Sequence, residues 1–349
     1  MRSAAAPDTR GMNMTMPRGV TLQAIQLPVR DKLDDVSRAM ARIVSSDLPL
    51  VGQVSAHLLA MRGKLFRPTL LLLSSQVEER EGSGKGEAEM DKAVTLAAAL
   101  ELIHLATLVH DDAVDHSALR RGMPTVNALF SHQISVIMGD FLYSTALTHL
   151  VELGDLEALQ ALTRASTEMT LGEMRQLAVT EPLRFTEREY YDLIRSKTAS
   201  LMRTACELGA LSGARKYGVA LGTFGENLGM AFQIADDLLD YREQMETTGK
   251  PSGLDLREHK VTLPLIHALR EMTPPSRQEV ERLFDSETVT DDDIASVVRI
   301  VDENGGFEYA RARGDEFAER AHDALADLPD TVARRSLTAS ISYVMERHS

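Results

Sequence analysis

Two copies of one acidic pattern, DDAVD and DDLLD, are the part of this chain best suited to chemistry. Each motif follows a strongly apolar run, LATLVH before the first and MAFQIA before the second. Residues four apart share a helix face, so the first and last aspartates of each motif lie one turn apart. Such carboxylate-rich, all-oxygen groups suit Mg²⁺, which binds a few carboxylates together with substrate phosphates. The six aspartates are Asp111, Asp112, Asp115, Asp236, Asp237 and Asp240.

Basic and polar groups in other segments suit phosphate oxygens. In RGKLFRP, the spacing puts Lys64 and Arg67 on one side of a helix start that Pro68 helps to define. The guanidinium groups after the first motif suit bidentate binding of a diphosphate. Together these groups would hold two diphosphates, one through Mg²⁺ at the aspartates and one directly by cations. Taken one at a time, these residues have simpler interpretations. The lysines and arginines could be solvated surface charges, and His104 could be a hydrogen-bonded histidine of the core. The set is Gly63, Lys64, Arg67, His104, Arg120, Arg121, Lys197, Thr198 and Gln233.

The apolar patterning predicts that helices position these residues. Periodic apolar residues run from about residue 31 to the end. No period-2 run of β-branched residues is found, so no sheet is expected. Thr186 and Glu189 form a capping box, and Thr125 and Gly154 bound another helix. The expected helices are 31–46, 49–61, 67–79, 90–115, 125–152, 156–179, 187–213, 218–246, 259–272, 276–284, 291–303, 306–327 and 331–347.

Composition narrows the class of protein. The net charge of −14 argues against nucleic acid as a partner, but metal ions would still allow a phosphorylated small molecule. The lone Cys206 excludes an internal disulfide and fits a reducing, cytoplasmic compartment. No apolar stretch reaches the ~18 residues of a membrane span, and no secretory signal is visible at the N-terminus. We expect a disordered or loosely attached tail at 1–30 and one catalytic domain at 31–349.

Five motifs, in this order and spacing, resemble those of the trans-isoprenyl (polyprenyl) diphosphate synthases from about residue 35 to 345. They are GKLFRP at 63–68, LVHDDAVDHSALRRGMPT at 108–125, Lys197-Thr198, FQIADDLLDY at 232–241 and GKPSGLDLREHKVTLP at 249–264. The resemblance implies an all-α, single-domain isoprenoid-synthase-type helical bundle around a deep central cavity, usually as a homodimer. One departure is that the family often has Gly-Lys where this chain has His259-Lys260.

The resemblance also implies a reaction. Isopentenyl diphosphate would attack the allylic cation left when an allylic diphosphate, such as farnesyl diphosphate, ionises. About two or three Mg²⁺ ions per active site would bind Asp111, Asp112, Asp115, Asp236 and Asp240. The allylic diphosphate would contact Arg120, Lys197, Thr198, Gln233, Asp237, Lys250 and Lys260. Isopentenyl diphosphate would contact Gly63, Lys64, Arg67, His104 and Arg121. The catalytic set would be Asp111, Asp115, Lys197, Asp236 and Lys250.

Small residues ahead of the first motif bear on product length. Thr107 and Ala106 lie four and five residues before Asp111, about one turn deeper on the same face. In the family that the chain resembles, bulky aromatics at these positions stop growth early, so the resemblance implies that the small pair belongs to a long-chain synthase that makes quinone side chains. Tight packing between helices is the alternative reason for small residues. The chain-length candidates are Ile103, Ala106, Thr107, Met138, Phe141 and Leu142.

Several alternatives stay open at this stage. A short-chain synthase of the geranylgeranyl type differs only in product length. A non-catalytic subunit of a heteromeric synthase could lose aspartates, yet all six are present. A class I terpene cyclase typically lacks a second DDxxD and the second substrate's cations. A di-iron bundle would need Glu-x-x-His pairs on facing helices, and no facing pair is identified.

Overall fold

The computed structural model describes residues 19–61, 63–78, 85–246 and 253–346, which are almost entirely helical, so the all-α prediction is confirmed. The first half contains α1 (Leu22–Gln26), α2 (Arg30–Ile43), α3 (Pro49–Ala60), α4 (Phe66–Ser75), α5 (Lys85–Val114), α6 (Val126–Leu129), α7 (His132–Leu153) and α8 (Leu156–Leu177). The second half contains α9 (Glu187–Ile194), α10 (Ser200–Gly213), α11 (Gly218–Glu246), α12 (Leu254–Arg257), α13 (Leu263–Glu271), α14 (Pro274–Phe284), α15 (Asp291–Glu303), α16 (Gly306–Ala324) and α17 (Val332–Glu346). Short 3-10 turns are η1 (Leu27–Val29), η2 (Pro182–Arg184) and η4 (Arg215–Tyr217), and η3 (Arg195–Ala199) is a π-helical turn.

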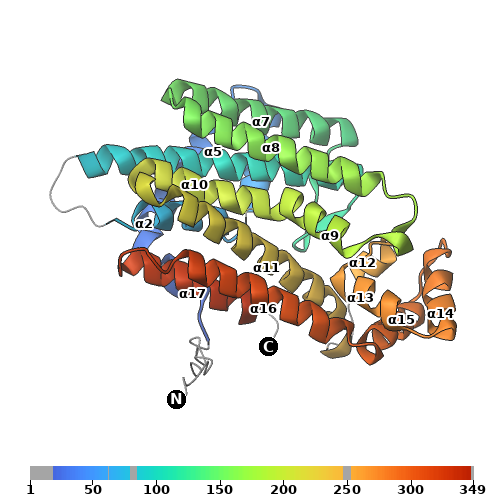
Figure 1. Ribbon diagram of the computed structural model, residues 1–349. Helices are drawn as coiled ribbons and strands as arrows, with labels where there is room; N and C mark the ends of the chain where they lie inside the picture. The colour runs from blue at the N-terminus through green and yellow to red at the C-terminus, as the bar shows by residue number, and fades with distance from the viewer. Residues whose placement is uncertain (1–18, 62, 79–84, 247–252, 347–349) are drawn as a thin grey trace, which may run out of the picture.

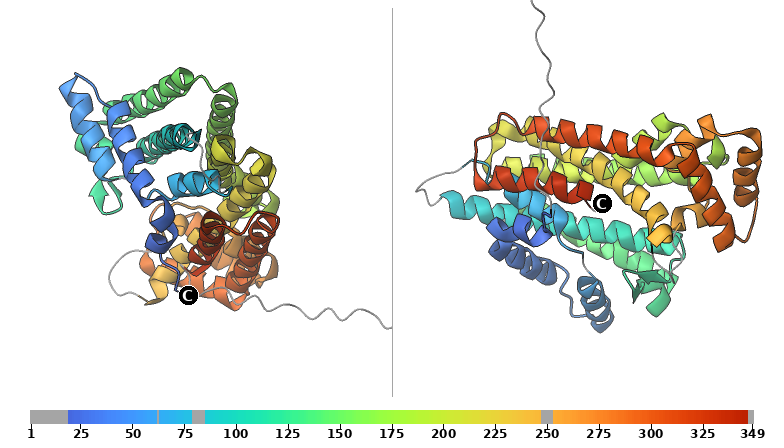
Figure 2. Two further views of the ribbon diagram at one scale, coloured as in Figure 1. Left: turned by 90° about the vertical axis from the view of Figure 1, so that its left-hand side faces the viewer. Right: turned by 90° about the horizontal axis from the view of Figure 1, so that it is seen from below.

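The two helices that carry the aspartate motifs, α5 and α11, lie in the middle of the bundle. Together with α4 and α10 they form its central packing. The pair α7 and α8 lies on one side, and the pair α16 and α17 lies on the other (Figure 1). The short helices α12 to α15 gather at one end of the molecule (Figure 1). Seen end-on, α5 is enclosed by its neighbours (Figure 2).

The enclosure of α5 explains why it is apolar on nearly all of its faces. Residues 96–100 (LAAAL) have no exposed surface, as expected for a helix in the interior of a bundle. The expectation that no apolar stretch reaches the length of a membrane span was wrong, because Met90–Val114 and His132–Leu153 would suffice by length and composition alone. The apolar window of the first is 72% buried within the protein, and that of the second only 33%. The apolar character of α5 is therefore accounted for by the core, whereas α7 keeps an exposed apolar side.

Three helix predictions need correction. The helix expected at 125–152 is broken between α6 and α7, because the Ser131 side chain accepts a hydrogen bond from the Ile134 amide and starts a new helix. Its predicted end at Gly154 is confirmed, with φ at 71°. The helix expected at 187–213 contains the π-helical turn. The helix expected at 259–272 is preceded by α12, and regular helix resumes only at Leu263.

The prediction that the chain contains no sheet was also wrong in one place. A two-residue antiparallel hairpin pairs β1 (Leu119–Arg120) with β2 (Met123–Pro124), directly after the first aspartate motif. Arg121 and Gly122 make its turn with φ of 53° and 74°. Because a strand this short has no alternating pattern, periodicity could not reveal it.

The N-terminal segment is more ordered than expected from residue 19 onward. Ile25 and Val29 are buried, and the Gln26 side-chain amide donates to the Lys64 carbonyl at 2.7 Å and to Thr69 Oγ1 at 3.0 Å. The tail expected at 1–30 is therefore wrong for α1 and η1, which pack against the start of α4. Residues 1–18 lie outside the described part of the chain.

Candidate active site

A cavity of about 690 Å³ receives residues from both aspartate motifs. Asp115 reaches it from the end of α5 and Asp237 from α11. Lys197 and Thr198 reach it from the π-helical turn, and Lys260 from the segment after α12. Residues far apart in the sequence therefore surround one space, which is here called the aspartate-lined cavity.

The first motif lies in the last turn of α5. Asp111 and Asp112 are helical, and the Asp115 amide still donates to the Asp111 carbonyl at 2.8 Å, so the helical path continues through the motif. Burial raises the pKa of the Asp111 carboxyl to about 6; the charge of Lys197 opposes the rise. Asp112 is buried, and Arg120 Nε donates to both of its oxygens at 2.8 and 3.0 Å. In this structure Arg120 is thus paired with the motif itself.

Asp237, the middle residue of the second motif, is the centre of a buried hydrogen-bond chain. The Tyr190 hydroxyl donates to its Oδ2 at 2.6 Å, and Gln233 Nε2 donates to its Oδ1 at 2.8 Å. Gln233 Oε1 in turn accepts from Thr198 Oγ1 at 2.7 Å. Burial raises the pKa of Asp237 to about 7, against the effect of these donors. The chain links α9, the π-helical turn and α11, so the inner wall of the cavity is fixed by side chains.

The outer residues of the second motif have other surroundings. The Asp240 carboxylate accepts from the amides of Leu254 and Asp255, each at 3.1 Å, and so caps the start of α12. Asp236 is exposed. Burial, reinforced by Asp237 and Asp240, raises the pKa of Asp255 well above its usual range. The second motif thus belongs to a larger acidic group than the sequence suggested.

Both described lysines of the cavity are paired with acids. Lys197 Nζ lies 2.5 Å from Glu173 Oε2 and donates to Gln176 Oε1 at 3.1 Å. Lys260 Nζ lies 2.5 Å from Glu258 Oε2. Burial would lower the pKa of Lys260, but its acidic neighbours raise it, so the ammonium stays charged. Lys250 lies outside the described residues.

A second group of predicted residues meets where α4 and the hairpin approach α5. It is called the arginine–histidine cluster and comprises Gly63, Lys64, Arg67, His104 and Arg121. Arg67 Nη1 donates to His104 Nε2 at 2.9 Å, and Arg121 Nη1 donates to the Met61 carbonyl at 3.0 Å. Burial and the charges of Arg67, Arg121 and Arg120 hold the pKa of His104 well below its usual value, so the ring is a neutral acceptor. A Cβ on Gly63 would lie 2.8 Å from the Arg121 guanidinium, which explains the glycine. Lys64 is exposed.

Backbone strain gathers in the same segments. Among the described residues, the non-glycine residues with positive φ are Leu65, His116, Arg121 and His259, at 51° to 54°. Each lies in a loop that the motif analysis singled out. Left-handed backbone costs energy in a residue with a side chain and is found mostly at functional sites. His259 has φ of 54°, a conformation that glycine adopts without this cost.

Comparison with known proteins agrees with this arrangement. The polyprenyl synthetase family model matches residues 48–301. The chain belongs to this family. The all-trans-nonaprenyl-diphosphate synthase (geranyl-diphosphate specific) of Rhodobacter capsulatus is 36% identical over 93% of this chain and 98% of its own length. The octaprenyl diphosphate synthase of Escherichia coli (strain K12) is 34% identical over 94% and 99%. The crystal structure of a polyprenyl synthase from Caulobacter crescentus CB15, complexed with calcium and isoprenyl diphosphate, matches with a TM-score of 0.85 at 32% identity, over 94% of this chain and 98% of that chain.

Within this polyprenyl synthetase fold, the chain-length candidates lie on two helices that pack together, α5 and α7. Ile103, Ala106, Met138 and Leu142 are buried, and Thr107 and Phe141 are partly buried. None of the six lines the aspartate-lined cavity. Their role in product length stays a prediction.

Sequence reasoning missed much of the cavity lining. The missed polar residues include Glu173 and Gln176 on α8, Tyr190 on α9 and Asp255 on α12. Tyr190 lies seven residues, two helical turns, before Lys197, and this spacing could have identified it. Glu173 and Gln176 share a helix face at a spacing of three, but only the folded structure brings that face to Lys197.

The predicted metal ligands are not gathered into one preformed site. Among the residues that the structure describes, no three acidic, histidine or cysteine side chains converge closely enough to hold an ion. Asp112 is paired with Arg120, and Asp240 caps α12. Of the five predicted ligands, all of which the structure describes, Asp115 alone lines the aspartate-lined cavity.

Proposed function

We propose that this polyprenyl synthetase is a head-to-tail prenyltransferase that makes a long-chain all-trans polyprenyl diphosphate. It would condense isopentenyl diphosphate with an allylic diphosphate such as farnesyl diphosphate. One observation carries the proposal: an acid-rich cavity with lysines begins where α5 ends, at Asp115, and a separate cationic cluster lies around His104 on the same helix. That arrangement offers one site for a metal-bound diphosphate and one for a diphosphate held by cations alone.

Different residues of the chain would bind the two substrates. Lys197, Thr198 and Lys260 would bind the allylic diphosphate as it leaves, and Arg120 would bind it on release from Asp112. The arginine–histidine cluster would hold isopentenyl diphosphate with its double bond toward the allylic carbon. After that double bond attacks the allylic cation, a proton is lost to the departing pyrophosphate, and the chain is five carbons longer. Exclusion of water from the cavity once both substrates are bound would protect the cation.

The donor set fits Mg²⁺. The oxygen ligands are carboxylates, and burial raises the pKa of Asp111 to about 6, a cost that a bound cation would remove. Asp111, Asp112, Asp115, Asp236 and Asp240 would hold about two or three ions together with the diphosphate. Bound Mg²⁺ would stabilise the negative charge that builds on the leaving diphosphate. Because these carboxylates are now held by other groups, we expect metal and allylic diphosphate to bind together.

Product length is the finer part of the proposal. Ala106 and Thr107 are small side chains next to the first motif, and the octaprenyl and nonaprenyl names of the relatives agree with long products. Such products are precursors of quinone side chains, and an enzyme acting on diphosphates of this kind would work in the cytoplasm. No nucleic acid is expected as a partner.

The exposed apolar side of α7 and α8 would be covered by a second copy of the chain. Ile137, Val151, Leu156, Met174 and Leu177 are each more than half exposed, and these two helices form an outer layer (Figure 1). Exposed apolar residues in number on one outer layer are typical of an interface. Ile137→Glu should convert a dimer into monomers in analytical ultracentrifugation. Val332→Glu, at the start of α17 on the opposite side of the molecule, is the control and should leave the dimer intact.

The activity test uses purified protein, farnesyl diphosphate, excess isopentenyl diphosphate and Mg²⁺, followed by sizing of the dephosphorylated products. We expect products well beyond twenty carbons and no elongation when EDTA removes the metal. Products of twenty carbons would replace the long-chain proposal by a short-chain synthase. Absence of any elongation would contradict the function and favour a non-catalytic subunit.

A further inference from the structure

The π-helical turn, Arg195–Ala199, is the least regular helical segment at the cavity. Its end is marked by the Ser200 amide, which donates to the Arg195 carbonyl five residues earlier instead of four. Such turns cost stability and occur mostly at functional sites, where the extra residue redirects side chains. Here the redirected pair is Lys197 and Thr198, which both line the aspartate-lined cavity.

Small residues on two neighbouring helices make room for this turn. A Cβ on Gly172 of α8 would lie 3.0 Å from Ser196 Cβ. A Cβ on Gly229 of α11 would lie 2.6 Å from Ala199 Cα. Contacts that close leave no space for any larger residue, so the turn is seated between α8 and α11. Its position relative to the second aspartate motif therefore depends on how tightly α11 is held against it.

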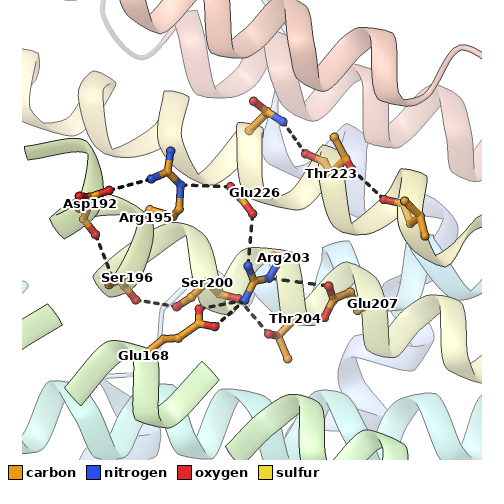
Figure 3. Close-up of polar contacts among 12 residues, drawn as sticks. Glu168, Asp192, Arg195, Ser196, Ser200, Arg203, Thr204, Glu207, Thr223 and Glu226 are labelled. Atoms are coloured by element: carbon orange, nitrogen blue, oxygen red, sulfur yellow. Dashed lines mark hydrogen bonds and ion pairs between the residues drawn. The ribbon is translucent and has the colours of Figure 1, made fainter. Parts of the chain in front are cut away.

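The outer side of the turn is held to α11 by one carboxylate. Arg195 Nε donates to Glu226 Oε1 at 3.2 Å, and Arg203 Nη1 donates to Glu226 Oε2 at 3.3 Å (Figure 3). Arg195 is the first residue of the turn, and Arg203 lies one helical turn beyond its end. Glu226 thus spans the irregular segment from outside.

Other contacts on this side act within the helix alone. The hydroxyls of Ser196, Ser200 and Thr204 donate to carbonyls four residues earlier, at 2.8, 2.6 and 2.9 Å (Figure 3). These bonds satisfy carbonyls along the turn but do not fix it against α11.

Glu168 on α8 accepts from Arg203 Nη2 at 3.0 and 2.8 Å, yet makes no contact with Arg195 among the hydrogen bonds and ion pairs of the described residues.

We propose that Glu226 is a positioning residue for the allylic diphosphate site. By tying Arg195 and Arg203 to α11, it holds the π-helical turn so that the two inward side chains face the second aspartate motif. On that inner side, Thr198 bonds to Gln233, which lies seven residues after Glu226 on α11. One helix therefore holds the turn from both sides. The inference rests on the proposed function, because it assigns the inward pair to the allylic diphosphate.

The kinetic test compares two isosteric variants, Glu226→Gln and Glu168→Gln. Both weaken the partners of Arg203, but only the first weakens the bond to Arg195. Because the arginine and glutamate side chains are partly exposed, we expect a moderate effect, about a three- to five-fold rise in KM for farnesyl diphosphate in Glu226→Gln. The KM for isopentenyl diphosphate should stay within about twofold, and Glu168→Gln should leave both values within about twofold. An equal rise for both substrates, or equal effects of the two variants, would show that Glu226 acts only on stability.

A second readout does not depend on turnover. Hydrogen exchange at the Ser200 amide reports the π-type bond itself. Its exchange should accelerate in Glu226→Gln and stay unchanged in Glu168→Gln, while amides in the middle of α10 serve as an internal reference. Arg195→Gln should reproduce the acceleration, and the double variant with Glu226→Gln should fall short of the sum of the two single effects, since both remove the Arg195–Glu226 contact. Unchanged Ser200 exchange, or additive effects, would overturn the positioning role. Absence of elongation by the wild type would refute the proposed function but leave this exchange result intact.

Discussion

The aspartate-lined cavity and the arginine–histidine cluster share α5 but differ in how their charges are satisfied. In the cluster, Arg67 donates to a neutral His104 and feels the charge of the buried Glu101, and Arg121 donates to a backbone carbonyl, so the cations outnumber this one acid. In the cavity, both described lysines are paired with acids, and burial raises the pKa of Asp237, as it does that of Asp111 close by. The cluster is therefore ready for an anion, whereas the cavity needs a cation first. This difference predicts that the allylic diphosphate requires metal for binding and that isopentenyl diphosphate does not.

The largest expected effect is at the first motif. Asp111→Asn keeps the shape of the side chain but removes the charge that would hold metal against the leaving diphosphate. We expect turnover to fall by about a hundred- to a thousandfold while the thermal midpoint stays near that of the wild type. Asp302→Asn, an exposed acid on α15, is the control and should be fully active. Steady-state rates near those of the wild type in Asp111→Asn would remove the metal assignment from the cavity.

The next prediction separates the two regions by substrate. Arg67→Ala or Lys64→Ala should raise the KM for isopentenyl diphosphate about ten- to a hundredfold, with less effect on the allylic substrate. Lys197→Ala should do the reverse. Initial rates with one substrate varied and the other saturating give both values. If every variant weakened both substrates alike, the two-region map would be wrong.

A third prediction extends the cavity toward the product. Ala106→Phe should place a ring beside the growing chain and shorten products to about fifteen to twenty carbons, because helix side chains lean away from the metal end. The first condensation should stay fast. Overpacking could cost about 1–3 kcal/mol, so the thermal midpoint is measured alongside. Ala106→Ser is the matched control and should keep the original product length. A folded Ala106→Phe with unchanged products would exclude Ala106 from the tunnel wall.

The smallest effect concerns the cluster and pH. The pKa of His104 lies well below its usual 6.5 because of burial and the neighbouring arginines. Below about pH 6.5 the unfolded chain takes up a proton that the folded chain does not, so the free energy of unfolding falls as pH falls. The slope from this group reaches at most about 1.4 kcal/mol per pH unit. Urea unfolding at pH 7.5 and 5.5 should show a smaller loss in His104→Gln than in the wild type, and an equal loss in both would contradict the neutral ring.

Much of this could be predicted from the sequence because the signals are local. The bounds of α11 and α15 and the capping box at Thr186 follow from apolar period and cap residues, and the structure agrees with them. The motifs likewise indicated which segments surround the cavity.

Other features depend on contacts that no local pattern records. The π-helical turn has the same apolar period as an ordinary helix, and its extra residue is accommodated by Gly172 and Gly229 on other helices. The pairing of Arg120 with Asp112 and the cap that Asp240 provides for α12 are choices among several possible partners. These pairings determine which carboxylates and cations are already bound to other groups before substrate arrives. The sequence therefore identified the functional residues but not their partners.

The most direct test of the difference between the two regions is calorimetric titration with and without Mg²⁺. Isopentenyl diphosphate is titrated into the wild-type protein, and so is the unreactive thiolo analogue of farnesyl diphosphate, each in Mg²⁺ and in EDTA. We predict that isopentenyl diphosphate binds with similar affinity in both buffers and that the analogue binds only with Mg²⁺. Metal-independent binding of the analogue, or loss of isopentenyl diphosphate binding in EDTA, would contradict the account.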